Sequence, residues 1–250
     1  MEILFVSDYV CPYCLVAKEA LRQAMAETGI TPDITWHPYE LTPEPKPQVD
    51  TYHDEKRKAG YQILVEPCKK LGLDMKLPPN VVPRPRTRWA FEGWYYACEQ
   101  GKGEEYNELM YRAYFIDELD IGDISVLVKL AESLGLNGED YKAAVLSGKY
   151  SELEQAACDH ARNVLEIKGV PSIYINGEKI ALKTFDKEEM IEILQNEERR
   201  KEGGATVVCN GDSCTMVPAE QIVCNGDTCT MPGQQAEEEE IEEIPAIPEF

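Results

Sequence analysis

The first forty residues show two kinds of hydrophobic pattern, short runs typical of strands and a repeat at helical spacing. Residues 2–7 are a short apolar run, which predicts a buried strand. From Pro12 to Glu27, apolar residues recur at helical spacing, and Pro12 suits the first helical position because the N–H it lacks would be unpaired there. Residues 34–39 predict a second strand, so the chain opens with the order β-α-β.

The middle of the chain is helical in pattern, and the strand pattern returns after it. Proline-rich loops at 40–50 and 78–85 interrupt the helices. The predicted helices cover 51–71 (with a break at Pro67), 87–100, 104–116, 123–134, 139–147 and 150–167. Two β-rich runs, 172–175 and 179–182, then flank Asn176-Gly177, which predicts a hairpin. A last amphipathic helix is predicted over 187–200.

The order β-α-β, helices, β-β-α predicts one α/β core. The two N-terminal strands and the two C-terminal strands can share one sheet, and the helices between them would form a large all-helical insertion. We expect the sheet domain to comprise 1–50 and 165–202, the insertion 51–164, and a separate C-terminal tail 203–250.

The tail has its own pattern. Cys209 and Cys214 flank Asn-Gly-Asp-Ser, and Cys224 and Cys229 flank Asn-Gly-Asp-Thr, so the two CX4C pairs form a repeat with a period of 15 residues. A turn at each Asn-Gly would bring the two sulfurs of a pair together across a small hairpin. Residues 237–250 are rich in glutamate and are predicted to be disordered.

Composition and charge exclude several classes of function. Hydrophobic residues are 43% and charged residues 28%, which is typical of a soluble globular protein. The net charge of −21 argues against binding to nucleic acid and to anionic membranes, and no apolar run is long enough to span a bilayer. Residues 2–7 lack the basic flank of a signal peptide, so we expect a cytoplasmic protein. Thiols there stay mostly reduced, and the nine cysteines are expected to serve catalysis, metal binding or the core.

Cys11-Pro12-Tyr13-Cys14 is the strongest candidate for chemistry. It lies between the first strand and the first helix, where unpaired N–H groups and the helix dipole favour negative charge on Cys11. The thiolate is the nucleophilic form of cysteine. Cys14 lies one turn further and can close a disulfide with Cys11. Cys11 can therefore attack a substrate disulfide, and Cys14 can resolve the mixed disulfide.

Other interpretations of the polar residues stay open at this point. Cys11 and Cys14 could be half of a zinc site, but a four-cysteine site needs a second CxxC pair and the chain has none. Asp8 could relay a proton to Cys11 or cap the helix. The isolated cysteines are expected in the core, and the three histidines, which show no ligand spacing, in surface or core roles: Cys68, Cys98 and Cys158, and His37, His53 and His160.

Four stretches resemble the DsbA family in its FrnE-like branch of cytoplasmic oxidoreductases. They are Ser7 to Cys14, Trp36 to Leu41, Tyr114 to Ile121 and Gly169 to Pro171. The resemblance covers about residues 1–200. It implies a thioredoxin-like fold with a helical insertion and thiol–disulfide exchange at Cys11 and Cys14.

The resemblance also implies a substrate site. In thioredoxin-like folds a cis-proline faces the CxxC motif, and the backbone of the preceding residue pairs with the substrate, which assigns these roles to Pro171 and Val170. Pro12 and Tyr13 are expected to contact substrate too. Periplasmic DsbA proteins have Pro-His between the cysteines and many FrnE-like chains have Pro-Trp, so the strongly oxidising poise of the periplasmic enzymes is not implied here.

The tail cysteines allow three interpretations. Each pair could be a redox dithiol that serves Cys11 and Cys14, because some FrnE-like proteins resemble this chain in having a C-terminal CX4C. The four thiolates of Cys209, Cys214, Cys224 and Cys229 could instead form one zinc site. The third interpretation is that they are flexible thiols near a disordered end.

These observations predict a thiol–disulfide oxidoreductase whose substrates are disulfide-containing proteins or small thiols. No nucleotide-binding motif is present, so no organic cofactor is expected, and zinc in the tail is the one metal considered. The alternatives are a glutathione-dependent isomerase or transferase of the kappa-like branch, whose members have serine where Cys11 stands, and a zinc-binding thiol chaperone. The sequence carries no signal for an oligomeric state.

Overall fold

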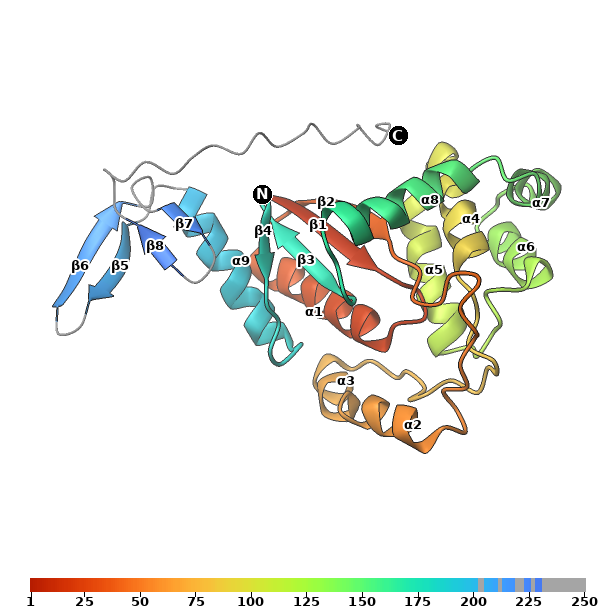
Figure 1. The fold of residues 1–250 in the computed structure, drawn as a ribbon, viewed down its shortest axis with the longest axis horizontal. Helices are drawn as coiled ribbons and strands as arrows, with labels where there is room; N and C mark the ends of the chain where they lie inside the picture. Colours follow the sequence, from red (N-terminus) through yellow and green to blue (C-terminus); the bar gives the residue numbers. More distant parts are fainter. Residues whose placement is uncertain (202–204, 211–212, 219–222, 226–227, 231–250) are drawn as a thin grey trace. The chain divides into compact units, whose positions relative to one another are not determined.

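The structure is a computed structural model, drawn in Figure 1. It describes the backbone of residues 1–201, 205–210, 213–218, 223–225 and 228–230, and the side chains of residues 1–200. The chain divides into two compact units, one over Met1–Ile191 and a second that begins at Glu192.

A four-stranded mixed sheet forms the centre of the first unit. Its strands are β1 (Glu2–Ser7), β2 (Asp33–Pro38), β3 (Ser172–Ile175) and β4 (Glu178–Ile180). They lie in the order β2-β1-β3-β4, with β1 parallel to β2 and the other pairs antiparallel. The strands from the two ends of the core therefore share one sheet, and the predicted thioredoxin-like fold with a helical insertion is confirmed.

Helix α1 (Pro12–Thr28) follows β1, and its boundaries reflect local chemistry. Pro12 occupies the first helical turn, where no N–H is needed. Gly29 ends the helix with a φ of 72°, in the left-handed region that glycine adopts without a steric penalty. The buried face includes Ala17, Leu21 and Ala24.

Two groups of helices fill the chain between β2 and β3. The first group is α2 (Glu55–Gln62) and α3 (Val65–Leu71); the second is α4 (Arg88–Glu99), α5 (Gly103–Phe115), α6 (Ile124–Ser133), α7 (Gly138–Leu146) and α8 (Ser151–Asp159). Figure 1 shows α4 to α8 gathered beyond one end of the sheet, whereas α3 contacts α1. A π-helical turn, His160–Val164, continues α8, and α9 (Lys187–Lys201) follows β4.

Some predicted boundaries differ from the structure. The predicted helix 51–71 is two helices, as the predicted break implies, but they part between Gln62 and Val65 rather than at Pro67, which lies in the first turn of α3 and has no helical bond to break there. The first of them starts at Glu55, because the Asp54 side chain caps it by accepting from two backbone N–H groups. The α-helix predicted to reach 167 ends at Asp159, and β4 ends at Ile180.

The tail forms two antiparallel hairpins, β5 (Ala205–Asn210) with β6 (Ser213–Pro218) and β7 (Val223–Asn225) with β8 (Thr228–Thr230). Cys209 lies opposite Cys214 in the register, and Cys224 opposite Cys229. Residues 237–250 lie outside the described residues. The domain boundaries given above stay predictions.

Aromatic packing ties the loop before Cys11 to the second group of helices. The ring of Tyr9 stacks on Phe91 of α4 with centroids 4.6 Å apart and meets Tyr111 of α5 edge-on at 5.2 Å. All three rings are buried. The loop that carries the cysteine motif is therefore held by α4 and α5 as well as by β1.

Gly93→Ala is expected to destabilise the protein by about 1–3 kcal/mol, because a Cβ on this buried position of α4 would collide with the hydroxyls of Tyr141 and Tyr106. Gly60→Ala in α2 is the matched control: its Cβ would meet no atom within 4 Å, and the better helix propensity of alanine should stabilise by up to about 1 kcal/mol. Urea unfolding measures the free energy of unfolding of both variants, and an equal change in the two would contradict the prediction.

Candidate functional site

Cys11 is the N-cap residue of α1, with a φ of −92° and a ψ of 114°. Its N–H donates to the carbonyl oxygen of Asp8 at 3.0 Å, and its own carbonyl accepts from the N–H of Cys14 at 3.1 Å. The residue is only 4% exposed. The turn from β1 into α1 thus places the Cys11 sulfur at the end of the helix where unpaired N–H groups lie.

The loop before β3 meets Cys11. The Cys11 thiol donates to the carbonyl oxygen of Val170 at 3.3 Å, although the two residues are 159 positions apart. The Val170–Pro171 peptide bond is cis, as the resemblance implies. Val6 of β1 pairs with Ser172 of β3, and this register brings Pro171 to the turn that carries the cysteines.

Cys14 differs from Cys11 in its surroundings. Its side chain is fully buried, and the two thiols are free rather than joined. Burial, followed by the hydrogen bond and the charge of Cys11, raises the pKa of Cys14 well above its ordinary value. Cys14 therefore keeps its proton in the reduced pair and can donate it to the Cys11 sulfur.

Tyr13 connects the motif to two other elements. Its hydroxyl donates to the carbonyl oxygen of Gly60 on α2 at 3.1 Å. Its ring lies 5.6 Å from that of Phe185, in the segment between β4 and α9. Tyr13 is half-buried, whereas Pro12 is buried, so Tyr13 is the more accessible of the two residues between the cysteines.

A groove with a volume of about 440 Å³ runs beside the cis-proline. Its walls are mostly apolar and come from the loop before β3, from β4 and from the segment after β4; they include Pro171, Ile180, Leu182 and Phe185. Lys179 is the one charged residue among those that line it. The groove can accept an apolar side chain next to the cysteine motif.

Two buried acids lie behind the motif. The Asp8 carboxylate accepts from the N–H of Leu41 at 2.7 Å and from that of Val10 at 3.4 Å, so its side chain joins the ends of β1 and β2 and does not cap α1. Burial raises the pKa of Asp8. Burial, with the charges of Asp8 and Glu154, raises the pKa of Glu40 to about 7. Glu40 lies within a stretch that resembles the DsbA family, but no spacing signalled its burial.

The structure also pairs two histidines that sequence spacing did not connect. Nδ1 of His160 lies 3.3 Å from Nε2 of His37, and Nδ1 of His37 lies 3.0 Å from the carbonyl oxygen of Pro38. Burial lowers the pKa of His37 to about 4. Among the side chains that the structure describes, no group of three or more histidine, cysteine or acidic residues could hold a metal ion.

The remaining cysteines divide by burial. Cys68 and Cys158 are buried, which confirms the expectation of core roles, whereas Cys98 is partly exposed. Burial raises the pKa of Cys68 to about 11 and that of Cys98 to about 12, so both stay protonated. The side chains of the four tail cysteines lie outside the described residues. In the described part of the chain no helix is both long and apolar enough to cross a bilayer.

Comparison with known proteins identifies relatives over most of the chain. Residues 2–195 match the DSBA-like thioredoxin domain family. Over 202 residues the chain is 36% identical to the uncharacterized protein YwbO of Bacillus subtilis (strain 168), which covers 80% of this chain and 99% of that protein.

Three solved structures share the fold at lower identity. A probable DsbA oxidoreductase from Streptomyces coelicolor has a TM-score of 0.66 and 23% identity, covering 93% of this chain and 100% of that one. The 2-hydroxychromene-2-carboxylate isomerase has a TM-score of 0.62 and 17% identity, covering 81% and 98%. The cytosolic disulfide reductase DsbM from Pseudomonas aeruginosa with GSH has a TM-score of 0.59 and 16% identity, covering 80% and 100%.

Glu40→Gln is expected to change how stability depends on pH. Because the pKa of Glu40 is raised from 4.5 to about 7, the native state holds a proton there that the unfolded chain releases near pH 4.5. The stabilisation by this proton is complete below pH 4.5 and is lost as the pH rises through about 7. Between these values, the free energy of unfolding of the wild type should fall by about 1–3 kcal/mol relative to Glu40→Gln.

Urea unfolding at a series of pH values measures this difference. His37 acts in the opposite direction, since its lowered pKa gives stability above pH 6.5 that is lost as the pH falls toward about 4. That contribution is present in both proteins and cancels in the difference. Parallel stability curves for the wild type and Glu40→Gln would contradict the assignment.

Proposed function

This chain belongs to the DSBA-like thioredoxin family, and on that premise we propose that it is a thiol–disulfide oxidoreductase that acts through Cys11 and Cys14. The observation that carries the proposal is the meeting of three features at one point: the Cys11 sulfur, the N-terminus of α1 and the carbonyl oxygen of Val170 before the cis-proline.

The proposed reaction begins with Cys11. Its thiolate attacks one sulfur of a substrate disulfide, forms a mixed disulfide and releases the first substrate thiolate, which takes a proton from solvent. Cys14 then attacks the Cys11 sulfur, and its proton passes to the departing substrate sulfur. This step forms the Cys11–Cys14 disulfide and releases the second substrate thiol, so two electrons pass from the protein to the substrate. A dithiol reductant restores the pair, and the reverse sequence oxidises a substrate dithiol.

Val170 and Pro171 are proposed to position the substrate. The Val170 carbonyl that accepts from the Cys11 thiol can pair with a substrate backbone N–H once Cys11 is engaged in the mixed disulfide. The apolar groove beside Pro171 would hold the residue next to the substrate cysteine. Pro12 and Tyr13 complete this surface. We propose disulfide-containing proteins and small thiols as substrates, with no bound cofactor in the first unit.

The finer assignment is to the FrnE-like branch and to the cytoplasm. The resemblance of the Ser7–Cys14 and Trp36–Leu41 stretches supports the branch. The similarity in fold to a disulfide reductase that is described as cytosolic is consistent with the compartment.

Glutathione-dependent isomerase or transferase activity is a second candidate, favoured by the fold shared with 2-hydroxychromene-2-carboxylate isomerase. The kappa-like relatives have serine where Cys11 stands, and such a reaction has no use for a second sulfur at Cys14. The buried, protonated Cys14 beside Cys11 favours the redox function instead.

We also propose that the tail pairs, Cys209 with Cys214 and Cys224 with Cys229, are redox dithiols that exchange electrons with Cys11 and Cys14. The cysteines of each pair lie opposite each other in a hairpin register. Directly opposed strand residues have Cβ atoms about 4.5–5.5 Å apart, not far from the 3.5–4.5 Å of a disulfide. A zinc site formed by the same four cysteines, as in a zinc-binding thiol chaperone, is the competing outcome.

Cys11→Ser should abolish the reduction of insulin by dithiothreitol that the wild type catalyses, because serine cannot form the mixed disulfide. In Cys14→Ser, Cys11 should still attack the substrate disulfide, but the mixed disulfide should accumulate because the resolving sulfur is missing. Insulin turbidity measures the first effect, and non-reducing gels the second. Cys98→Ser, which removes a partly exposed thiol outside the motif, should retain wild-type activity. Activity in Cys11→Ser would refute the proposal.

A chain truncated after Glu202 is expected to fold and to keep the activity of Cys11, because the unit Met1–Ile191 is compact on its own. If the tail pairs exchange electrons with the motif, the rate of reduction or reoxidation of the Cys11–Cys14 pair should differ from that of the full chain. Stopped-flow kinetics and metal analysis test this. About one zinc per full-length chain, released by a thiol oxidant, would favour the zinc site, and identical kinetics without metal would refute both roles.

A further inference from the structure

Residues 46–88 are basic in a chain that is otherwise acidic. This basic segment contains ten lysines and arginines and five acids, whereas the whole chain has 25 bases and 46 acids. It links β2 to α4 and includes α2 and α3. The segment therefore differs in sign from the rest of the molecule.

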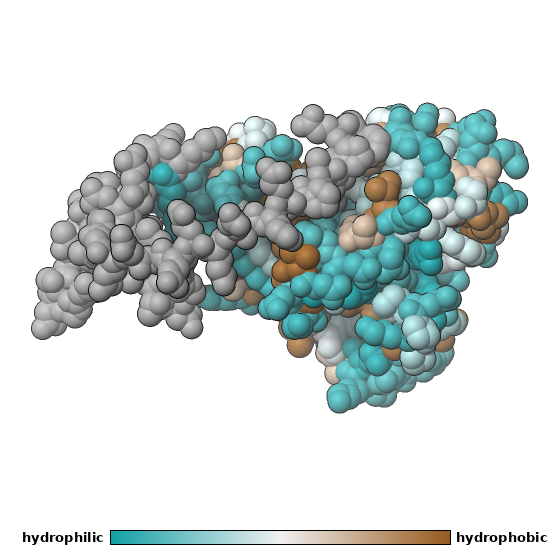
Figure 2. All heavy atoms as spheres, turned by 45° about the horizontal axis from the view of Figure 1, so that its top comes forward, coloured by the Kyte–Doolittle hydropathy of each residue, from teal (hydrophilic) through white to brown (hydrophobic). Residues whose placement is uncertain are grey.

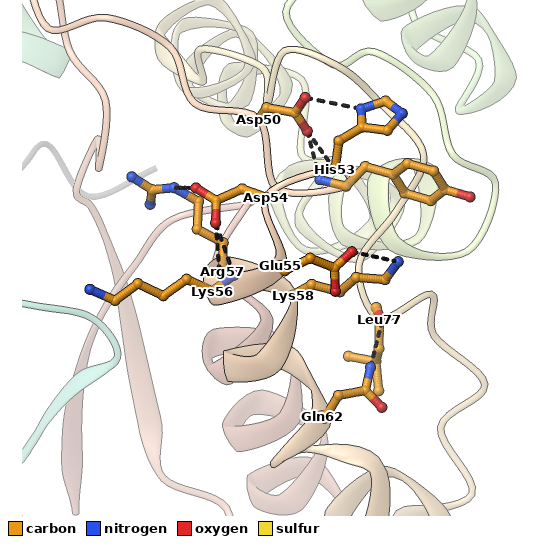
Figure 3. A network of polar contacts seen from close by, with 10 residues as sticks. Asp50, His53, Asp54, Glu55, Lys56, Arg57, Lys58, Gln62 and Leu77 are labelled. Carbon is orange, nitrogen blue, oxygen red and sulfur yellow. Dashed lines mark hydrogen bonds and ion pairs between the residues drawn. The ribbon is translucent and has the colours of Figure 1, made fainter.

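Most acids of the basic segment are already paired within it. Figure 3 shows Asp50 bound to His53, Asp54 at the N-terminus of α2 and beside Arg57, and Glu55 beside Lys58. Glu66 pairs in the same way with Lys69 at 2.7 Å. Among the described side chains, three exposed lysines of the segment form no ion pair: Lys46, Lys56 and Lys76. The unpaired charge of the segment is therefore positive.

The basic segment lies directly against the cysteine motif. The Tyr13 hydroxyl donates to the carbonyl oxygen of Gly60 in α2 at 3.1 Å. Tyr13 lies between Cys11 and Cys14, so this hydrogen bond joins α2 to the loop that carries the reacting sulfur.

One face of α2, continued by its C-cap residue Ile63, presents a cation, an open position and an apolar side chain in a row. Lys56, Gly60 and Ile63 are spaced by four and three residues, so they share a face of the helix; we call this row the α2 ridge. Figure 3 shows Lys56 extending away from the paired acids. A Cβ at Gly60 would meet nothing within 4 Å, and Ile63 is 68% exposed.

Ile63 is the most exposed of the large hydrophobic side chains that the structure describes. On the face drawn in Figure 2, hydrophobic residues form small separate patches within a mostly hydrophilic surface. Lys56 and Ile63 are seven residues apart, about 10 Å along the helix. A ligand that uses both, and that also places a sulfur at Cys11, must be longer than a small thiol.

We propose that the α2 ridge is the docking surface for an acidic protein segment that carries the disulfide to be exchanged at Cys11. A carboxylate of the partner pairs with Lys56, an apolar side chain packs on Ile63, and the chain between them passes over Gly60 toward the motif. This inference rests on the proposed function and names the class of substrate for the same site.

The charge pattern gives the ridge a selective effect. The net charge of −21 repels an acidic partner over most of the surface, whereas the basic segment attracts it next to Cys11. Attraction between exposed charges acts mainly on the rate of association and weakens when salt screens it. The preference of the α2 ridge for acidic substrates should therefore appear in kcat/KM at low ionic strength and vanish at about 1 M salt.

The test compares peptides that contain the same intramolecular disulfide flanked by Glu, Gln or Lys, with neutral hydroxyethyl disulfide as a small substrate. At low salt the full-length wild type should reduce the Glu peptide with a kcat/KM about 3- to 10-fold above that of the Gln peptide. Lys56→Glu should remove or reverse this preference and leave the reduction of hydroxyethyl disulfide unchanged. Glutamate suits the first turn of α2, so this variant is expected to fold.

Lys142→Glu is the matched control, because Lys142 is an exposed lysine of α7 with no ion pair among the described side chains and the same change of charge. It should keep the preference for the Glu peptide. Ile63→Ser should lower kcat/KM for all three peptides and spare hydroxyethyl disulfide.

If Lys56→Glu and Lys142→Glu lower the preference for the Glu peptide equally, the α2 ridge is not the docking surface, and the net charge of the protein explains the preference. Equal rates for the three peptides in the wild type would overturn it as well, while turnover of hydroxyethyl disulfide would leave the proposed function standing. Failure to reduce any disulfide would refute the proposed function and the ridge together.

Discussion

The antiparallel pairing of β1 with β3 is the contact on which the rest of the structure depends. It joins two strands separated by most of the first unit, and its register at Val6 and Ser172 brings the cis-proline to the turn that carries Cys11. The chain between β1 and β3 can hold eight α-helices at little cost, because the entropy of closing a loop grows only with the logarithm of its length. A slip of one residue would turn every side chain of β3 to the opposite face of the sheet and remove Val170 from Cys11.

The site combines an apolar sheet with a buried polar layer behind it. Asp8 joins the ends of β1 and β2 through the N–H groups of Val10 and Leu41, and Glu40 follows β2 with a pKa near neutrality. Buried acids cost stability unless they are hydrogen-bonded or protonated. Asp8 is hydrogen-bonded, and the raised pKa of Glu40 favours its protonated form. Asp8 precedes Cys11 by three residues, so this polar layer adjoins the site of the proposed thiol exchange, while Cys14 itself is shielded from solvent.

Much of this arrangement could be predicted from the sequence, and the exceptions have physical causes. The strands, α1 and the hairpin at Asn176-Gly177 follow from local patterns, and the cysteine motif is a local signal at the N-terminus of a helix. A break within 51–71 was predicted at Pro67, but the start of α2 after Asp54 was missed, because capping by a side chain competes with apolar periodicity. The contact between His37 and His160, and the burial of Glu40, arise from tertiary packing that no spacing in one chain encodes. The position of Val170 at Cys11 came from a family resemblance rather than from any property of the residues themselves.

Tyr13 lies between the cysteines, and it also touches α2 through Gly60 and the segment after β4 through Phe185. The residue at this position is usually considered for its effect on the neighbouring sulfur. In this protein the same side chain also connects α2 to the segment after β4. A change of Tyr13 to the histidine or tryptophan of related motifs therefore alters two things at once, the electronic environment of Cys11 and the contacts with Gly60 and Phe185. A redox potential measured on such a variant therefore reports the change in these two contacts together with the change in the electronic environment of Cys11.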